Sequence, residues 1–472
     1  MTQIAAIIGG GVIGGGWAAR FALSGWNVTI FDPDPEAARK IDAVMANARR
    51  SLPALSDVAL PPEGQVKIVP TLAEAVANAD WIQESAPERL EMKHRILNEI
   101  QTHCRKDALI GSSTSGFKPS ELQQGALRPE QIFVAHPFNP VYLLPLIELV
   151  GDDQTTARAH AILTEIGMKP LKVRKEIDAH IADRFLEAVW REALWLVKDG
   201  IATTQEIDDA IRYGFGLRWG QMGLFETYRV AGGEAGMAHF IAQFGPCLQW
   251  PWTKLMDVPE LTDELVHTIA SQSDAQSGSH SIRELERIRD DNLVSMMRSL
   301  KGRNWGAGAL LNEHDARLCA GHEPDFTKPF ISVDRSIPVD WSDYNGHMNE
   351  SRYGQVWSDA ADAVMRMIGA DADYIAAGLS YFTVDTHTKF MNECHVGEHI
   401  TVETQILEGA GKKLQLFHEM KNASGALVAS CTQLLIHVSL ETRKSCDPGP
   451  QIVTKLAAIM AAQAALSQNE AI

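Results

Sequence analysis

A glycine-rich turn near the start of the chain most constrains what the first part of it can fold into. Ile4–Ile8 is an apolar run that predicts a buried strand, and Gly9-Gly10-Gly11-Val12-Ile13-Gly14 follows it at once. In a strand–turn–helix unit with GxGxxG spacing, the first glycine permits the tight turn and the second lets a pyrophosphate approach the backbone. The third lets the helix pack on the strand. The turn therefore predicts a dinucleotide-binding α/β domain, with cofactor-binding positions Gly9, Gly11, Val12, Ile13 and Gly14.

The second predicted strand ends in an acid. Val28–Phe31 is apolar and leads into Asp32, 18 positions beyond Gly14. An acid at this place binds the hydroxyls of the adenosine ribose. Pro33 and Asp34 follow it without an adjacent arginine, so a 2′-phosphate would be repelled. The sequence therefore favours NAD over NADP.

A histidine and a glutamate lie on two neighbouring apolar segments. Ile132–Ala135 predicts a strand that runs into His136, which is bracketed by prolines at 137 and 140, and Glu148 lies inside the apolar run Leu146–Val150. A carboxylate in such a strand is costly to bury unless it has a partner. An imidazole paired with it keeps one tautomer and titrates near neutral pH, as a general base for an alcohol must. The alternative is a His–Glu pair that only satisfies the core.

Several further residues, together with those above, match the motifs of one known family. The carboxyl ends of strands in an open parallel sheet line one crevice, which predicts that Glu88, Ser115 and His136 lie on the nicotinamide side. The segments Gly9–Asp32, Ser113-Thr114-Ser115, His136–Pro140 and Glu148 resemble the 3-hydroxyacyl-CoA dehydrogenase superfamily over about the first 320 residues.

The resemblance implies a role for each matching residue. His136 would be the catalytic base, Glu148 its orienting partner, and Ser115 a hydrogen-bond donor to the substrate oxygen; Glu88 and Lys93 would line the cofactor site. One departure is Asp183-Arg184, where the family usually has asparagine before arginine. A negative charge beside the substrate argues against an ordinary acyl-CoA substrate.

The second domain reads as helical from about Asp178 to Cys319, which resembles the all-helical C-terminal domain of the same superfamily. That likeness implies that this domain provides half of the substrate cleft and the contact between the two subunits of a dimer. Aromatic faces bind a quaternary ammonium group, and an acid such as Asp183, Glu187 or Glu192 adds attraction. Asp183 and Trp190 are the substrate-binding candidates; core or dimer interface is the alternative for each aromatic. The aromatics are Trp190, Trp195, Tyr213, Phe215, Trp219, Phe225, Tyr228, Trp250 and Trp252.

The third domain begins after a polar stretch at residues 321–328. One helix over Ser351–Ile368, followed by strands in an antiparallel meander, predicts an α+β layer. The motif from Asp343 to Gly346-His347-Met348-Asn349 resembles the hotdog-fold thioesterases of the 4-hydroxybenzoyl-CoA thioesterase type. That resemblance implies Asp343 as nucleophile or general base, with His347 and Asn349 fixing the loop. A hotdog that binds or dimerises without turnover is the alternative.

Composition excludes several classes of function. The net charge of −17 argues against a nucleic-acid or anionic-membrane surface, because both need a basic patch. No apolar run is long enough to span a bilayer, and the N-terminus shows no secretory signal. Six scattered cysteines without a CxxC pair fit a reducing cytoplasm and offer no zinc site, and no metal site is expected.

These features together predict a multidomain protein with three parts. They are an α/β Rossmann domain at 1–177, an all-α 3-hydroxyacyl-CoA dehydrogenase-type domain at 178–320, and an α+β hotdog domain at 329–440 with a tail at 441–472. The pairing resembles the carnitine 3-dehydrogenases that carry a betainyl-CoA thioesterase, which implies carnitine and an acyl-CoA thioester as substrates, NAD as cofactor and a cytoplasmic homodimer. Alternatives are a 3-hydroxybutyryl-CoA or gulonate-like 3-dehydrogenase with an accessory thioesterase, and a crystallin-like structural protein.

Overall fold

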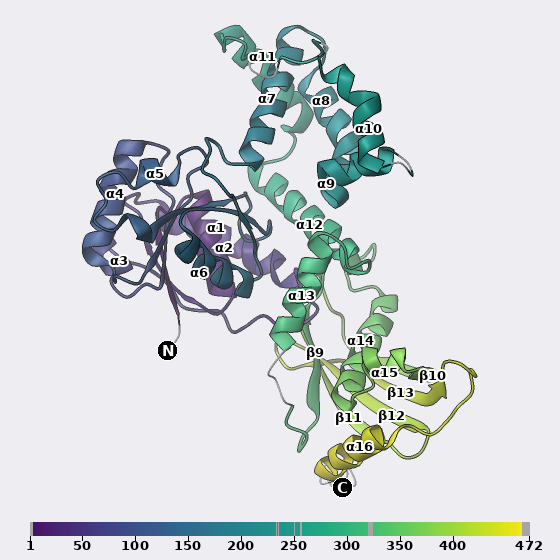
Figure 1. The fold of residues 1–472 in the computed structure, drawn as a ribbon. Coiled ribbons are helices and arrows are strands. Elements are labelled where there is room, and N and C mark those ends of the chain that lie inside the picture. Colours follow the sequence, from purple (N-terminus) through teal and green to yellow (C-terminus); the bar gives the residue numbers. More distant parts are fainter. Residues whose placement is uncertain are drawn as a thin grey trace. The chain divides into compact units, whose positions relative to one another are not determined.

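The computed structural model describes residues 3–232, 234, 236–249, 251–254, 257–319 and 324–464. They divide into two compact units, Met1–Arg49 with Pro62–His314, and Arg50–Pro61 with Asp315–Ile472. The first unit contains an eight-stranded sheet and the second a five-stranded sheet (Figure 1). Residues 321–323 of the predicted linker and Trp250 lie outside the described residues.

The eight-stranded sheet has the order β3-β2-β1-β4-β5-β6-β7-β8. Neighbouring strands run parallel except for β6 and β7, which pair antiparallel. The order reverses between β1 and β4, where a doubly wound sheet opens its ligand crevice. The strands are β1 Ile4–Ile8, β2 Asn27–Phe31, β3 Val66–Ile68, β4 Trp81–Glu84, β5 Leu109–Ser112, β6 Ile132–Pro137, β7 Leu146–Val150 and β8 Lys169–Lys172.

Helices cover both faces of this sheet, which is why its central strands, such as β1 and β4, are almost entirely buried. In Figure 1, α1 (Val12–Leu23), α2 (Ala37–Ser51) and α6 (Asp153–Glu165) gather on one side. The other side carries α3 (Leu72–Val76), α4 (Leu90–His103) and α5 (Pro119–Leu122). Leu97 and Ile100 of α4 form one core cluster with Ile82 and Ile110 of the strands. The Rossmann prediction for this part of the chain is confirmed.

The rest of the first unit is helical. The described residues between Ala182 and Cys319 contain no strand. Tyr142 donates a hydrogen bond of 2.7 Å to Asp290 on α12, and both residues are buried, so this bond anchors the helices to the sheet domain. The helices are α7 Ala182–Lys198, α8 Thr204–Ala210, α9 Gly216–Ala231, α10 Gly236–Phe244, α11 Asp263–Ser277, α12 Ile282–Lys301 and α13 Ala307–Cys319.

The second unit wraps a five-stranded antiparallel sheet, ordered β10-β13-β12-β11-β9, around one long helix. Trp357 and Val364 of that helix are fully buried against the sheet. Only β11, β12 and β13 follow one another as a meander, because β9 and β10 form the two edges. The elements are β9 Phe330–Ser336, α14 Glu350–Ile368, α15 Ala372–Ala376, β10 Leu379–Phe390, β11 His399–Glu408, β12 Lys413–Asn422 and β13 Leu427–Ser439.

Two segments join the second unit from outside the predicted 329–440 range. Arg335, whose side chain is 1% exposed, pairs at 2.9 Å with Asp57 of the Arg50–Pro61 segment. Helix α16 (Pro450–Gln463) buries Ile452 and Leu456 in the same core cluster as Val364. The sequence predicts only a loose helix in the tail, whereas α16 packs into the hotdog core. Residues 465–472 lie outside the described part.

Among the described residues, no helix combines the length and the apolar character that a membrane crossing requires.

Candidate active sites

His136 and Glu148 face each other across the antiparallel pair β6 and β7. They are directly opposite in register, so their side chains project from the same face of the sheet. His136 Nδ1 lies 2.9 Å from Glu148 Oε2, and the two side chains are 7% and 0% exposed. The carboxylate thus fixes the Nδ1–H tautomer and leaves Nε2 as the proton acceptor. The predicted pairing of base and orienting acid is present.

The second oxygen of Glu148 holds the beginning of helix α7. Glu148 Oε1 accepts the backbone N–H groups of Ile181 at 2.9 Å and Ala182 at 3.0 Å. Burial alone would raise the pKa of Glu148, but the hydrogen bonds from His136 and from these N–H groups outweigh it and hold the pKa below its usual range. One carboxylate therefore orients the imidazole and positions the helix that brings Asp183 to it.

Asp183 lies at the free nitrogen of the histidine. Its Oδ2 atom is 3.6 Å from His136 Nε2, and its side chain is 19% exposed. Burial raises the pKa of Asp183, and the nearby Glu148 and Glu187 carboxylates raise it further, against the opposing effect of His136. The structure thus brings together the predicted base, its partner and the acid that departs from the superfamily pattern.

His180 is a residue that the sequence argument did not single out. It is fully buried, and its ring centroid is 5.6 Å from that of His136. Burial lowers the pKa of His180, and the neighbouring His136 lowers it further. Ala179 and His180 both adopt positive φ, 58° and 49°, which non-glycine residues rarely do. The one feature of the sequence that could have indicated a role for His180 is its place three positions before the unusual Asp183.

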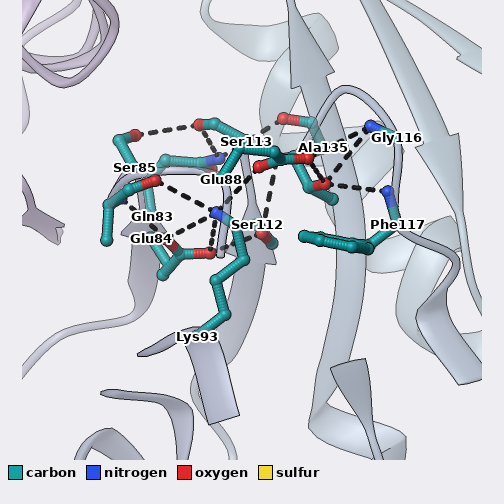
Figure 2. A network of polar contacts seen from close by, with 12 residues as sticks. Gln83, Glu84, Ser85, Glu88, Lys93, Ser112, Ser113, Gly116, Phe117 and Ala135 are labelled. Atoms are coloured by element: carbon teal, nitrogen blue, oxygen red, sulfur yellow. Dashed lines mark hydrogen bonds and ion pairs between the residues drawn. The ribbon is translucent and has the colours of Figure 1, made fainter. Parts of the chain in front are cut away.

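The loop that carries Ser115 is held by a polar network at the carboxyl ends of β4 and β5 (Figure 2). Glu88 accepts hydrogen bonds from Thr114 Oγ1 and, at 3.2 Å, from the N–H of Gly116. The turn on either side of Ser115 is thereby fixed, while Ser115 itself is exposed.

Lys93 lies inside the same network and is 1% exposed. Its Nζ atom lies 2.9 Å and 3.1 Å from the two oxygens of Glu84 and 3.3 Å from Glu88 Oε2. Ser112 Oγ also donates to Glu84, so this buried carboxylate joins β4, β5 and α4. Lys93 therefore positions Glu88, which is 41% exposed at its side chain, and its place at the cofactor site stays a prediction.

The glycine turn has the shape that a pyrophosphate needs. Gly9 has φ of +101°, and a Cβ atom on Gly14 would lie 1.7 Å from the carbonyl oxygen of Gly9, so neither position tolerates a side chain. A Cβ on Gly11 would meet nothing within 4 Å, because the backbone there faces open space. Helix α1 begins at Val12 with no acid in its first turn and no side-chain cap, which suits an anion.

Asp32 closes the same site. It accepts the N–H of Gly10 through Oδ2 and that of Asp34, at 2.7 Å, through Oδ1. Its half-buried carboxylate is thus fixed at the end of β2, the place from which an acid reaches a ribose diol. These residues fit NAD.

The chain is similar to known proteins along its whole length. The model of the 3-hydroxyacyl-CoA dehydrogenase NAD binding domain matches residues 4–177, that of the C-terminal domain residues 180–264, and that of the thioesterase-like superfamily residues 337–456. A protein of Ruegeria pomeroyi, called L-carnitine dehydrogenase/betainyl-CoA thioesterase, is 65% identical over 99% of this chain and 97% of its own. A protein of Agrobacterium fabrum with the same name is 56% identical over 96% and 93%.

The chain belongs to the L-carnitine dehydrogenase/betainyl-CoA thioesterase family. It is therefore an enzyme with an NAD-binding dehydrogenase part and a thioesterase part, as predicted. A solved structure, 5-formyl-3-hydroxy-2-methylpyridine 4-carboxylic acid 5-dehydrogenase, described as an NAD⁺-dependent dismutase, covers 64% of this chain and 99% of its own. Its TM-score is 0.54 and its identity 26%.

The thioesterase part of this family member places Asp343 in a tight loop before α14. Its Oδ1 atom accepts the N–H groups of Asn345 at 2.8 Å and His347 at 3.1 Å. Asn349 caps α14 by accepting the N–H of Ser351 at 3.0 Å, as expected of a loop-fixing residue. Within the described part of the chain, Oδ2 of the half-buried Asp343 accepts no hydrogen bond, which leaves it available to a substrate or a water.

Four of the predicted aromatic residues, Trp190, Tyr213, Phe225 and Trp252, are exposed, and the other described ones are half-buried. Trp190 is 61% exposed, seven residues beyond Asp183 on α7, and therefore on the same helix face two turns away. Trp195 is occupied by cations of the chain itself, because the amino groups of Lys198 and Lys254 lie 4.2 Å and 4.0 Å from its ring centroid.

We expect two glycine substitutions to separate folding from cofactor binding. Gly14→Ala forces a Cβ onto the backbone of Gly9 and should destabilise the protein by about 3 kcal/mol or more. Gly11→Ala has room, with an ordinary φ of −67°, and should leave the melting temperature unchanged. It should still weaken NAD binding at least about tenfold, because its methyl group takes the space of the pyrophosphate. Thermal unfolding measures the stability of each variant, and calorimetric titration measures its affinity for NAD. A normal NAD affinity of Gly11→Ala would contradict the assigned cofactor site.

Proposed function

We propose that the first unit oxidises L-carnitine at its 3-hydroxyl to 3-dehydrocarnitine with NAD, and that the second hydrolyses betainyl-CoA to glycine betaine and CoA. Support comes from the relatives that carry both names and share more than half of their residues with this chain. The observation that carries the dehydrogenase half is the His136 imidazole, fixed by Glu148 on one side and facing Asp183 on the other.

The proposed chemistry uses His136 as the base. Its Nε2 atom takes the proton of the 3-hydroxyl, while the Nδ1–H group stays bonded to Glu148, whose negative charge stabilises the imidazolium. Ser115 donates to the same oxygen. NAD, when bound, accepts the hydride that leaves carbon 3. Positioning and proton transfer together supply most of the rate enhancement.

Asp183 is proposed to recognise the trimethylammonium group. A quaternary ammonium carries charge but no hydrogen-bond donor, so it is attracted by a carboxylate without competing for the Nε2 atom of His136. The charged form of Asp183 is disfavoured in the free protein, and a bound cation relieves this cost. Trp190, on the same face of α7, would add an aromatic surface farther out.

The carboxylate of carnitine needs a positive partner at the other end. Lys93 is buried and paired with Glu84 and Glu88, so its amino group is not available. We therefore propose Arg184, exposed beside Asp183, as that partner. An acid and a base next to each other on α7 suit a small zwitterion.

The protein is further proposed to act as a cytoplasmic homodimer. Large apolar side chains of the helical part are more than half exposed in the single chain, which supports contact with a second copy. They are Phe185, Leu186, Trp190, Tyr213, Leu217, Phe225, Val230 and Ile241.

The substrate is tested by following NADH absorbance with L-carnitine, 3-hydroxybutyryl-CoA and gulonate side by side. We expect turnover with L-carnitine and at least about a hundredfold loss of kcat in His136→Asn, since a positioned general base contributes roughly 10²–10⁴. Binding of NAD should persist in the variant, because His136 is not part of the glycine turn. Turnover of the CoA ester alone, or of none of the three, would refute the carnitine assignment.

Asp183→Asn tests the recognition of the cation. We expect KM for L-carnitine to rise roughly tenfold, or about 1.4 kcal/mol, with a smaller change in kcat. The folded-state pKa of Asp183 is raised, so its contribution to stability is present below the unfolded pKa and is lost as the pH rises through the folded pKa. Asp183→Asn should therefore raise the melting temperature at pH 7 and lose this gain near about pH 3.

Glu187→Gln is the matched control for that variant. It removes a charge one turn along α7 whose carboxylate is 3.9 Å from Arg191, so KM should change far less. An equal effect of both variants would point to general electrostatic attraction rather than a contact of Asp183 with the substrate.

The hydrolase half is tested separately by release of thiol from betainyl-CoA. We expect Asp343→Asn to lower the rate at least about a hundredfold while the dehydrogenase reaction is unchanged, because Asp343 belongs to the other unit. The amide keeps an oxygen that can accept the N–H groups of Asn345 and His347, so the loop should be preserved. An unchanged rate would remove Asp343 from the mechanism.

A further inference from the structure

Three metal-binding side chains meet on the surface of the second unit. His347, Glu393 and His395 each bring one ligand atom within 4.8 Å of the others. The Nε2 atom of His347 is 3.4 Å from Glu393 Oε2, and the rings of His347 and His395 have centroids 4.9 Å apart. His347 lies 46 positions before Glu393 in the sequence, so the cluster exists only in the folded chain.

The backbone explains why these side chains point the same way. In an extended segment, alternate residues project to opposite sides. Cys394 is fully buried, so its neighbours Glu393 and His395 both project outward. Met348 is 4% exposed and donates its N–H to the carbonyl of Cys394 at 2.8 Å, which turns the adjacent His347 outward as well. An antiparallel bridge between His347 and His395 completes the arrangement.

The composition of the cluster selects a class of ion. Two imidazoles and one carboxylate form the ligand set of mononuclear zinc sites with one open coordination position. Calcium and magnesium prefer sites made of oxygen alone. Glu398 lies next to the cluster and accepts the N–H of His395 at 3.1 Å, so the negative charge of a second carboxylate is close by. The set therefore suits Zn²⁺ or a similar transition-metal dication.

We propose that His347, Glu393 and His395 bind one Zn²⁺-class ion, with the fourth position open to water. The ion joins the loop of residues 343–349 to the segment that precedes β11. Asp343 donates its N–H to the carbonyl of His347 at 2.8 Å and accepts the N–H of His347 at 3.1 Å, so a bound ion also restrains the loop that presents Asp343. The sequence pattern predicts no metal site here, because His347 and the Glu393–His395 segment come together only in the folded chain.

The site is tested by titrating the full-length protein, after treatment with a chelator, with Co²⁺ as a coloured substitute for Zn²⁺. We expect one Co²⁺ per chain with visible absorption of low-symmetry coordination, displaced by Zn²⁺ that binds at about 1 μM or tighter. His395→Ala and His347→Ala should each weaken binding at least about tenfold. Thermal unfolding of the second unit should shift upward with Zn²⁺ in the unaltered protein, and by less at the same Zn²⁺ concentration in His395→Ala and His347→Ala.

His399→Ala is the matched control, since His399 is also a partly exposed histidine paired with an acid, Asp334, at 2.7 Å but lies outside the cluster. It should bind Co²⁺ like the unaltered protein. Equal binding by His395→Ala, or equal loss in His399→Ala, would overturn the site, as would an affinity for Zn²⁺ in the millimolar range. The result is independent of the proposed reactions, because it is read from metal binding and unfolding alone.

Discussion

The bridging carboxylate of Glu148 is the contact on which the arrangement of the first site depends. One of its oxygens fixes the tautomer of His136, and the other accepts two backbone N–H groups at the start of α7. A buried charge is costly unless its hydrogen-bonding capacity is used, and here three donors use it. Because one carboxylate makes both sets of contacts, the imidazole and the start of the helix that carries Asp183 are held in place by the same group. Glu148 therefore sets the distance between base and acid.

Glu84 is a second buried carboxylate that holds separate segments of the first unit together. Glu84 and Lys93 are almost fully buried and satisfy each other, and Ser112 and the N–H of Ala86 complete the shell of Glu84. Removing one partner of such a pair typically costs 3–5 kcal/mol, because the other is left charged and buried. This network fixes the ends of β4 and β5, from which the Glu88 and Ser115 loops emerge. Lys93 thus stabilises the loop that presents Glu88.

The parts that could be predicted from sequence are those in which local pattern and chemistry coincide. Gly9–Gly14, Asp32, and the His136 and Glu148 pair each combine a strand pattern with residues whose chemistry needs that place. The burial of Lys93 could not be predicted, because a lysine on an amphipathic helix is usually solvated. The position of His180 next to His136 could not be predicted, because it depends on the positive φ angles of Ala179 and His180. The assignment of Arg50–Pro61 to the second unit rests on long-range pairs such as Arg335 with Asp57, which leave no local pattern.

Asp183 illustrates a conflict between stability and recognition. A carboxylate in the first turn of a helix is favoured by the helix dipole, and α7 begins at Ala182. Burial and the neighbouring Glu148 act the other way, and the raised pKa of Asp183 shows that they prevail. An asparagine would be less costly there and could still donate a hydrogen bond to a substrate oxygen. The charged carboxylate of Asp183 is favourable only when a bound cation balances it. A quaternary ammonium does so without donating a hydrogen bond to Nε2 of His136, which stays free to accept the substrate proton. In the proposed reaction Asp183 therefore distinguishes the substrate, whereas Glu148 and His136 provide the chemistry.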